Sequence, residues 1–417
     1  MNFETFLSDS GQKDIMAKAE RLHTYLAGEH GIPPEHSPEQ ALGVQLLSAA
    51  GPRAAIRNRR GEKQTVIMLG SNSYLDLTRR PEVMEASRKA LEQYGYGMGA
   101  VSLYAGITDM HRELERAIAD FCGTEDAVLF PSGYGTNVGV ISALCGEGDV
   151  IINDSANHAS IFDGSLLSGA DVKVYPHGNM QRLEQLLKRL PPEQKGRLII
   201  TDGVFSMHGD LAELAVITDL AQRHGARVMV DDAHGIGIVG PGGRGTAAVF
   251  GVSGKVDLHV SMLSKAPGGL GGYCASSASV VRYLRLYART YFFSTSLPAP
   301  VVAGLTEVFR LFERDDAGRK ILWENIRYMH EGISRLGFKT TDPTSGIVPI
   351  IVGDETRLSA FHQALLDEGV YTNIVTYPAV RRKECRLRLC IMSSLERYDM
   401  DAALGALETA GRRCGVI

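Results

Sequence analysis

The sequence predicts an α/β fold in which a mostly parallel β-sheet lies between helices and is followed by a smaller α+β domain. Short runs that are rich in Val and Ile, and apolar almost throughout, recur along the middle of the chain. Such runs are typical of strands in a parallel sheet that is covered on both faces. Amphipathic segments alternate with these runs, and the alternation predicts βαβ units with right-handed crossovers.

The predicted strands share this composition and lie at residues 127–133, 149–155, 171–177, 197–205, 227–235 and 256–263. Between two of them, segment 179–190 places its leucines on one helical face, with Asn179 as the predicted N-cap. A second predicted helix, at 211–225, ends on Gly225, a residue type that commonly follows a helix C-terminus.

We expect three parts along the chain. Residues 1–60 are polar and helix-prone and are predicted to form an N-terminal arm. Residues 61–295 contain the alternating strands and helices and are predicted to form the large α/β domain. At "SLPAP" the pattern changes to a long helical stretch followed by helices and a few strands. Residues 296–417 therefore predict a small C-terminal α+β domain.

Composition excludes several classes of function. The net charge of −4 over 417 residues lacks the basic footprint of a nucleic-acid-binding protein. No uncharged apolar run approaches the length of a membrane span, and the first twenty residues resemble neither a signal nor a transit peptide. The six cysteines form no C-x-x-C pair and have no histidine at metal-ligand spacing. We therefore expect a cytoplasmic protein without a metal site.

Ionisable residues collect where the predicted strands end, which is the edge at which open parallel sheets bind ligands. Asp231 closes one apolar run and His234 follows it on the exit loop, while His158 stands after another strand. Lys265 lies in "SKAPGGLGGY", just after the last predicted strand. The segment "SGYGTN", residues 132–137, offers free backbone N–H groups before a predicted helix, which suits a phosphate.

Each of these features also has a purely structural explanation. A loop lysine is usually a solvated charge, a strand-end aspartate can be a cap, and a glycine-rich segment can be an ordinary turn. Together, however, they match what pyridoxal phosphate (PLP) needs. A lysine amine forms the Schiff base, a carboxylate holds the pyridine nitrogen, a flat side chain covers the ring, and N–H groups bind the phosphate. The combination predicts a PLP enzyme.

The chain resembles the α-oxoamine synthases, a family of fold-type I PLP enzymes. The resemblance covers the chain from about residue 65 and is carried by "HRELERAIADFCGTEDAVLFPSGYGTNVGVISAL", "NHASIFDG", "TDGVFSMHGDLAEL", "VDDAHGIGIVGPGGRG", "SKAPGGLGGY" and "RLRLCIMSS". Within the family, the C-terminal region is most similar to serine palmitoyltransferase, through "LWENIRYMHEGISRLGF", "ALLDEGVYTNI" and "AGRRCGVI". The family fold implies a seven-stranded sheet in the large domain and a homodimer with shared active sites.

The resemblance implies a role for each matching residue. Lys265 is expected to carry the cofactor and move the Cα proton, Asp231 to pair with the pyridinium, His234 to bond the phenolic oxygen, and His158 to stack on the ring. The further residues that the resemblance assigns to the cofactor are Gly133, Tyr134 and Ser206, with Ser294 and Thr295 from the other subunit. Those that it assigns to the amino acid are Arg388, whose guanidinium fork suits a carboxylate, and Asn72 and Tyr74.

The sequence departs from the family pattern at several positions. Met262 stands where the family usually has a phosphate-binding threonine, so that Ser261 or Ser264 would have to substitute. Ser102, His208 and Leu395 replace residues that are Arg, Asp and His in many relatives. We interpret these changes as evidence for an unusual substrate.

The implied reaction is a decarboxylative condensation of a small L-amino acid with an acyl thioester, delivered by coenzyme A or an acyl carrier protein. Serine with a fatty acyl-CoA, as in sphingolipid biosynthesis, is the favoured pair. Alanine with a pimeloyl thioester, as in an 8-amino-7-oxononanoate synthase, glycine with a short acyl-CoA, as in a glycine C-acetyltransferase, and a secondary-metabolite reaction are the alternatives. A PLP aminotransferase or lyase, or a non-catalytic partner subunit, represents a different class of function.

Overall fold

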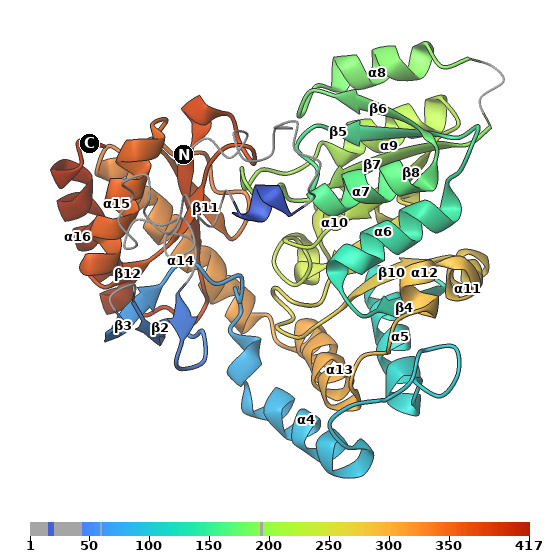
Figure 1. The fold of residues 1–417 in the computed structure, drawn as a ribbon, viewed down its shortest axis with the longest axis horizontal. Coiled ribbons are helices and arrows are strands. Elements are labelled where there is room, and N and C mark those ends of the chain that lie inside the picture. The colour runs from blue at the N-terminus through green and yellow to red at the C-terminus, as the bar shows by residue number, and fades with distance from the viewer. Residues whose placement is uncertain (1–15, 21–43, 59–60, 192–194) are drawn as a thin grey trace.

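The computed structural model describes residues 16–20, 44–58, 61–191 and 195–417. The greater part of the predicted arm at residues 1–60 thus lies outside the described residues. The chain forms two halves, which Figure 1 shows side by side. One half, drawn in green to yellow, holds the large sheet, and the other combines blue N-terminal strands with orange C-terminal elements.

The large sheet has seven strands in the order β4-β10-β9-β8-β7-β5-β6. Its strands are β4 (Asp126–Phe130), β5 (Val150–Asp154), β6 (Asp171–Tyr175), β7 (Arg197–Asp202), β8 (Arg227–Asp231), β9 (Leu258–Met262) and β10 (Gly272–Ser276). Strand β10 runs antiparallel to both of its neighbours, whereas β5 to β9 pair in parallel. The prediction of a mostly parallel seven-stranded sheet is confirmed.

Helices cover both faces of this sheet because its strands are apolar on both sides. In β7, Ile200 packs with side chains of one face and Ile199 with those of the other. The first face carries α6 (Gly133–Leu144), α7 (Ala159–Ser168), α11 (Ala278–Tyr287) and α12 (Arg289–Phe292), and the second carries α8 (Met180–Lys188) and α9 (Leu214–Arg223). The elements α4 (Pro81–Tyr94), α5 (Asp109–Cys122), α10 (Thr246–Val249) and α13 (Ala299–Arg314) complete this half.

The second half is assembled from both ends of the described chain. Its four-stranded sheet has the order β1-β2-β3-β12 and joins β1 (Gln45–Leu46), β2 (Arg53–Arg57) and β3 (Lys63–Met68) to β12 (Val370–Tyr371). A second sheet has three strands in the order β11-β14-β13, namely β11 (Ile347–Ile351), β14 (Arg386–Cys390) and β13 (Asn373–Val375). The helices α14 (Ala317–Arg335), α15 (Glu355–Asp367) and α16 (Arg397–Arg413) pack beside them (Figure 1). The domain limits at residues 60 and 295 stay a prediction.

The six predicted strand runs each overlap a strand of the large sheet. Asn179 caps α8, as predicted, by accepting a hydrogen bond from the Arg182 N–H over 2.9 Å. The long helical stretch after residue 299 is two helices, since α13 stops at Arg314 and α14 starts at Ala317. Every helix in the described ranges is too short or too polar to cross a lipid bilayer.

Candidate active site

A cavity of about 210 Å³ lies at the carboxyl ends of strands β7, β8 and β9. Its walls combine ionisable, hydroxyl and apolar groups, namely Gly133, Tyr134, His158, Asp202, Val204, Ser206, Asp231, Ala233, His234, Met262, Ser264 and Lys265. The residues come from loops that are far apart in sequence, and the parallel sheet brings them together because its strands end at one edge. Seven of the predicted cofactor residues, all except Ser294 and Thr295, are therefore in one place.

Lys265 enters this cavity from the turn that follows β9. Burial lowers the pKa of its ammonium below the ordinary lysine value, although the carboxylates of Asp231 and Asp202 oppose that shift. The positive charge of Arg388 lowers it further. A lysine with a lowered pKa supplies more of the free amine that attacks an aldehyde.

Asp231 ends β8 and is almost completely buried. Its Oδ2 accepts a hydrogen bond of 2.7 Å from Nδ2 of Asn137, and its Oδ1 accepts one of 3.1 Å from the N–H of Ala233. Asn137 also donates to the hydroxyl of Ser160, over 2.9 Å. The sequence analysis did not single out Asn137, because its burial and its contact with Asp231 appear only in the structure.

Asp202 is a second carboxylate at the cavity that the sequence analysis did not assign to the site. It ends β7 directly beside Asp231, since the two residues are partners in the strand register. Burial, together with the neighbouring carboxylate of Asp231, raises the pKa of Asp202 well above its ordinary value. The two strand-end aspartates thus stand side by side at the cavity, and burial together with their mutual repulsion favours the protonated form of Asp202.

His158 caps the N-terminus of α7 and keeps its ring open to the cavity. Its Nδ1 lies 2.7 Å from the hydroxyl of Ser160 and 3.3 Å from the Ser160 N–H, which fixes the ring. The ring of Tyr134 meets it edge to face, with centroids 6.3 Å apart. An exposed, fixed, flat side chain at the mouth of a cavity can cover an aromatic ring.

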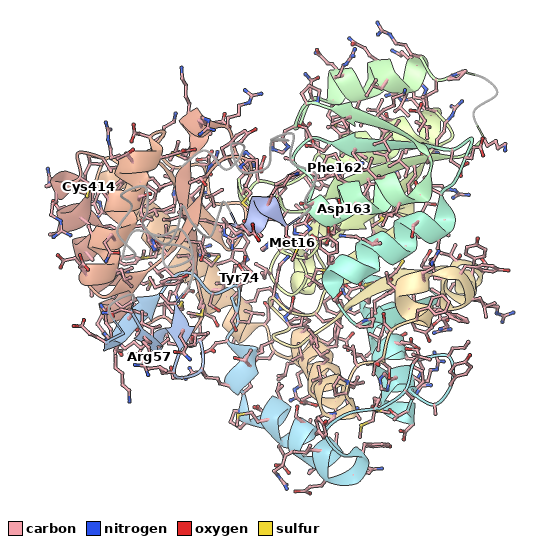
Figure 2. The ribbon with its side chains drawn as sticks, viewed as in Figure 1. Met16, Arg57, Tyr74, Phe162, Asp163 and Cys414 are labelled. Carbon is pink, nitrogen blue, oxygen red and sulfur yellow. The ribbon has the colours of Figure 1, made fainter. Side chains whose placement is uncertain are left out.

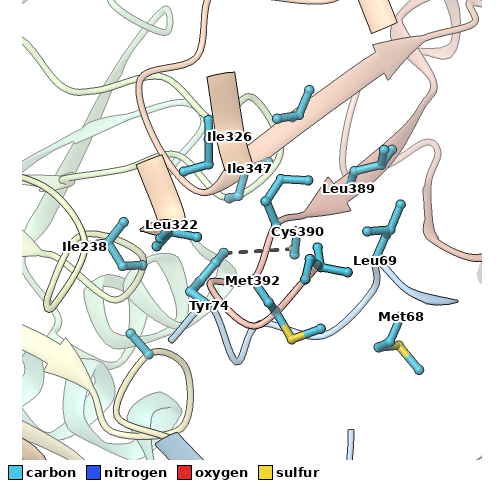
Figure 3. Close-up of a cluster of buried hydrophobic side chains, with 14 of the residues drawn as sticks. Met68, Leu69, Tyr74, Ile238, Leu322, Ile326, Ile347, Leu389, Cys390 and Met392 are labelled. Atoms are coloured by element: carbon cyan, nitrogen blue, oxygen red, sulfur yellow. Dashed lines mark hydrogen bonds between the residues drawn. The ribbon is translucent and has the colours of Figure 1, made fainter. Parts of the chain in front are cut away.

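His234 and Tyr74 form a buried pair at the back of the cavity. The Tyr74 hydroxyl lies 2.8 Å from His234 Nδ1 and 4.0 Å from the thiol of Cys390. Burial, with the charges of Lys265 and Arg388, lowers the pKa of His234 well below its ordinary value. Tyr74 lies between the two halves in Figure 2, and Figure 3 shows it packed among apolar side chains with its bond to Cys390 dashed.

Arg388 of β14 brings a positive charge from the second half to this region. Its Nη2 donates to Oδ1 of Asn72 over 3.1 Å, and its Nη1 donates to the backbone oxygen of Ser206 over 3.3 Å. The thiol of Cys390 approaches the same Asn72 oxygen at 3.3 Å. Asn72 therefore supports Arg388, whereas Tyr74, which was expected at the substrate, contacts His234 instead.

Met262 lies against the first residue of α6. A methyl group added at Gly133 would lie 1.9 Å from its sulfur, so any side chain at this position would require the thioether of Met262 to move. Ser132 caps the helix by accepting a bond of 3.0 Å from the Gly135 N–H. Of the two serines considered as substitutes for threonine, Ser264 lines the cavity, while Ser261 is fully buried and is not among the lining residues.

The remaining expected residues lie elsewhere. Ser294 and Thr295 follow α12, and Thr295 bridges to Val101; within the described chain neither lines the cavity. Ser102, His208 and Leu395 are also absent from the lining among the described residues, so Met262 is the departure that touches the cavity. Ser102 and Leu395 are buried, and the Leu395 carbonyl accepts a bond of 3.0 Å from Asn325.

Comparison with known proteins agrees with this geometry. The model of the aminotransferase class I and II family matches residues 64–407. The chain belongs to this family. It is 41% identical over 372 residues to the 8-amino-7-oxononanoate synthase of Thermoanaerobacter pseudethanolicus, which is 89% of this chain and 93% of that protein. It is 40% identical over 410 residues to the 4-hydroxy-2,2'-bipyrrole-5-methanol synthase PigH of Serratia sp., which covers 97% of this chain and 61% of that longer protein.

Among solved structures, the serine palmitoyltransferase of S. paucimobilis with a bound PLP–myriocin aldimine superimposes with a TM-score of 0.89 at 34% identity, over 97% of this chain and 100% of that one. Both kinds of relative are α-oxoamine synthases. This aminotransferase-family member is therefore a PLP-dependent α-oxoamine synthase, as expected. The relative from Thermoanaerobacter pseudethanolicus carries the name of one of the alternatives given above, 8-amino-7-oxononanoate synthase. The structural neighbour is a serine palmitoyltransferase, the type to which the C-terminal region was expected to be most similar.

Proposed function

We propose that this α-oxoamine synthase joins L-serine to an acyl thioester and releases CO₂ and a free thiol. The observation that carries the proposal is the placement of Arg388. Its guanidinium is held by Asn72 and by the backbone of Ser206, next to the cavity that contains Lys265. A planar fork at this position suits the carboxylate of an amino acid.

The cavity fits PLP in the chemistry of its walls. Lys265 would hold the cofactor covalently, Asp231 would face the pyridine nitrogen, and His158 would cover the ring. The N-terminus of α6, at Gly133 and Tyr134, would present N–H groups to the phosphate. With Nδ1 occupied by Tyr74, His234 would use Nε2 toward the phenolic oxygen. When bound, PLP supplies an electron sink that stabilises negative charge at the amino acid's Cα.

The protein groups then have defined tasks. Arg388 orients the amino acid through its carboxylate, so that the Cα–H bond points toward Lys265. The lysine amine, with its lowered pKa, removes the Cα proton and later returns one. Asn137 keeps the Asp231 carboxylate in place throughout. His158 limits access of water to the reacting face.

The names of the relatives support serine as the amino acid. PigH, whose match extends over 97% of this chain, forms a bipyrrole-methanol according to its name. Serine keeps its hydroxymethyl side chain on Cα when its carboxylate is lost as CO₂, so a serine-derived product carries such a group. Alanine is the second candidate, because the name 8-amino-7-oxononanoate synthase recurs among the sequence relatives at about 41% identity. We do not favour a non-catalytic partner subunit, because Lys265 is present.

We further propose that two copies share their active sites, as the family resemblance implies. Ser294 and Thr295 stand outside the cavity of their own chain, so a phosphate role would require a second copy. A mixture of a Lys265→Ala chain and a Thr295→Ala chain tests this. Recovery of activity on mixing, beyond that of either variant alone, supports shared sites.

The reaction is tested by measuring thiol release from acyl-CoA with serine, alanine or glycine as the amino acid, and with palmitoyl, pimeloyl or acetyl groups as the acyl chain. We expect the highest kcat/KM with serine, and CO₂ in equal amount to the thiol. Faster turnover with alanine and pimeloyl-CoA would assign the alternative. Conversion of the amino acid without thiol release would instead indicate an aminotransferase or lyase. Borohydride reduction should fix PLP on the peptide that contains Lys265.

A further inference from the structure

Beyond the proposed active site, one group of side chains in the described residues is placed to ligate a cation. It consists of His177, His208 and Asp210, whose candidate ligand atoms all lie within 4.8 Å of one another. The sequence spacing predicts no metal site, because these residues come from separate loops. The fold brings them together: His177 follows β6, while His208 and Asp210 follow β7, and both strands flank β5.

The first argument is the support behind His177. Its Nδ1 lies 3.1 Å from Oδ1 of Asp154, a carboxylate at the end of β5 that is almost fully buried. Asp154 is itself held by the N–H groups of Ala156 and Gly178, over 2.8 and 2.9 Å. A carboxylate that fixes one nitrogen of a histidine, so that the other faces a ligand, is the usual outer shell of a metal-binding imidazole.

The second argument is that one atom of His208 and one of Asp210 have unused capacity, whereas Nε2 of His177 already shares a hydrogen bond that a metal ion would replace. Nε2 of His177 lies 3.0 Å from Oδ2 of Asp210. The other oxygen of Asp210, and Nδ1 of His208, are buried atoms without a hydrogen-bond partner. The two imidazoles are 4.9 Å apart between ring centroids. Metal–ligand distances of about 2.0–2.2 Å place ligand atoms at most roughly 4.4 Å apart, so a small side-chain rotation closes this set.

The third argument is the rigidity of the loop that carries two of the ligands. The N–H of Gly209 donates to the Phe205 carbonyl over 2.8 Å. The Gly209 carbonyl accepts bonds of 2.8 and 2.7 Å from the hydroxyls of Thr344 and Ser345. A loop fixed from both sides holds its ligands in position before the ion arrives.

The charge around the group also favours a cation. Asp154 and Asp210 contribute two carboxylates. The nearby guanidinium of Arg386 is directed to the Met207 carbonyl at 3.3 Å and lies 4.0 Å from Glu384, which offsets its charge. Two imidazoles and one carboxylate suit zinc and similar divalent transition ions better than Mg²⁺ or Ca²⁺, which take oxygen ligands.

We propose that His177, His208 and Asp210 bind one divalent transition-metal ion of the zinc class, with Asp154 as the outer carboxylate. The ion would tie the end of β6 to the loop after β7. The loop after β7 also contains Ser206, whose carbonyl accepts a hydrogen bond from Arg388. The proposed metal site is therefore close in sequence to the residue expected to bind the substrate carboxylate.

The test uses the PLP-loaded protein after treatment with EDTA. Co²⁺ is titrated and followed by its visible absorption bands, and Zn²⁺ is measured by mass spectrometry after dialysis. We expect one ion per chain, a rise in melting temperature of about 2–4 °C with excess Zn²⁺, and a loss of affinity of at least about tenfold in His208→Ala and Asp210→Asn. Asp154→Asn should weaken binding by about 10- to 100-fold.

The matched control is His330→Ala, which removes a histidine of α14 and should bind the ion as the unchanged protein does. Each variant is first checked for PLP absorbance, and the use of two ligand variants guards against a failure of either one to fold. Equal affinity in the unchanged protein, His208→Ala and Asp210→Asn would overturn the proposal, because the ion would then bind elsewhere. Absence of binding at roughly 100 micromolar Zn²⁺ would also overturn the proposal and would show that the three side chains form only a hydrogen-bonded cluster.

Discussion

The amide of Asn137 holds the carboxylate of Asp231 through a hydrogen bond of 2.7 Å between Nδ2 and Oδ2. The two residues come from α6 and β8, and both are buried. The bond therefore connects α6, whose N-terminus is expected at the cofactor phosphate, to the carboxylate that is expected at the pyridine nitrogen. A change at Asn137 should affect the electronic role of Asp231 without removing the carboxylate itself.

We expect Asn137→Ala to lower kcat by about 10- to 100-fold, because hydrogen bonds to charged groups are worth about 1.5–3 kcal/mol. The visible absorption of bound PLP and its change with pH should shift as well. Asn153→Ala is the matched control, since Asn153 is an equally buried asparagine whose amide bonds to Ser165 over 3.0 Å. If both variants lose stability equally and the PLP spectrum is unaltered in Asn137→Ala, the bond has only a structural role.

Arg388→Lys should raise the KM for the amino acid by about 10- to 100-fold and leave the KM for the acyl thioester nearly unchanged. The lysine keeps the charge but cannot reach both Asn72 and the Ser206 carbonyl while it binds a carboxylate bidentately. Steady-state kinetics with each substrate varied in turn separates the two constants. Arg382→Lys, at an exposed arginine, is the control for the type of substitution. An unchanged KM for the amino acid in Arg388→Lys would show that Arg388 does not bind the substrate.

Met262→Thr should tighten PLP binding by about three- to tenfold. The thioether of Met262 cannot donate a hydrogen bond, whereas a threonine hydroxyl next to Gly133 could reach the phosphate. The PLP-free protein should melt at a lower temperature, because the smaller side chain leaves a void. Met262→Leu retains the volume without a hydroxyl and should leave the dissociation constant as it was. Equilibrium dialysis that gives the same constant for all three proteins would contradict the phosphate argument.

The attachment of PLP to Lys265 should speed up as pH rises, with a midpoint below that of a free lysine derivative. The sign follows from the pKa: burial disfavours the ammonium, so the free amine appears at a lower pH than usual. Below the midpoint, each pH unit should increase the rate about tenfold, since only the amine attacks. Stopped-flow absorbance on PLP-free protein, compared with Nα-acetyl-lysine amide, measures the difference. Coincident midpoints would show that the site does not activate this lysine.

The sequence predicted the parallel core well because each strand is a short run of Val and Ile bounded by polar loops. It also assigned to the cofactor seven of the residues that line the cavity. It did not single out strand β10, Gly272–Ser276, which contains neither Val nor Ile and consists of small residues apart from Tyr273. The sequence analysis did not assign Asn137, Asp202 or Cys390 to the site, because their roles come from contacts with residues far away in the chain. Likewise, His177 and His208 become neighbours only through the order of strands β7, β5 and β6.

The pairing of β3 with β12 sets an order for events during synthesis. Val370 aligns with Ile67, so the two partners are separated by about 300 residues of chain. At translation rates of about 5–20 residues per second, β3 waits roughly 15–60 s for its partner to leave the ribosome. During that interval the large sheet can form, while the edge of β3 stays open to unwanted pairing. We would expect expression of this protein to depend on chaperones and on growth temperature more than its final stability suggests.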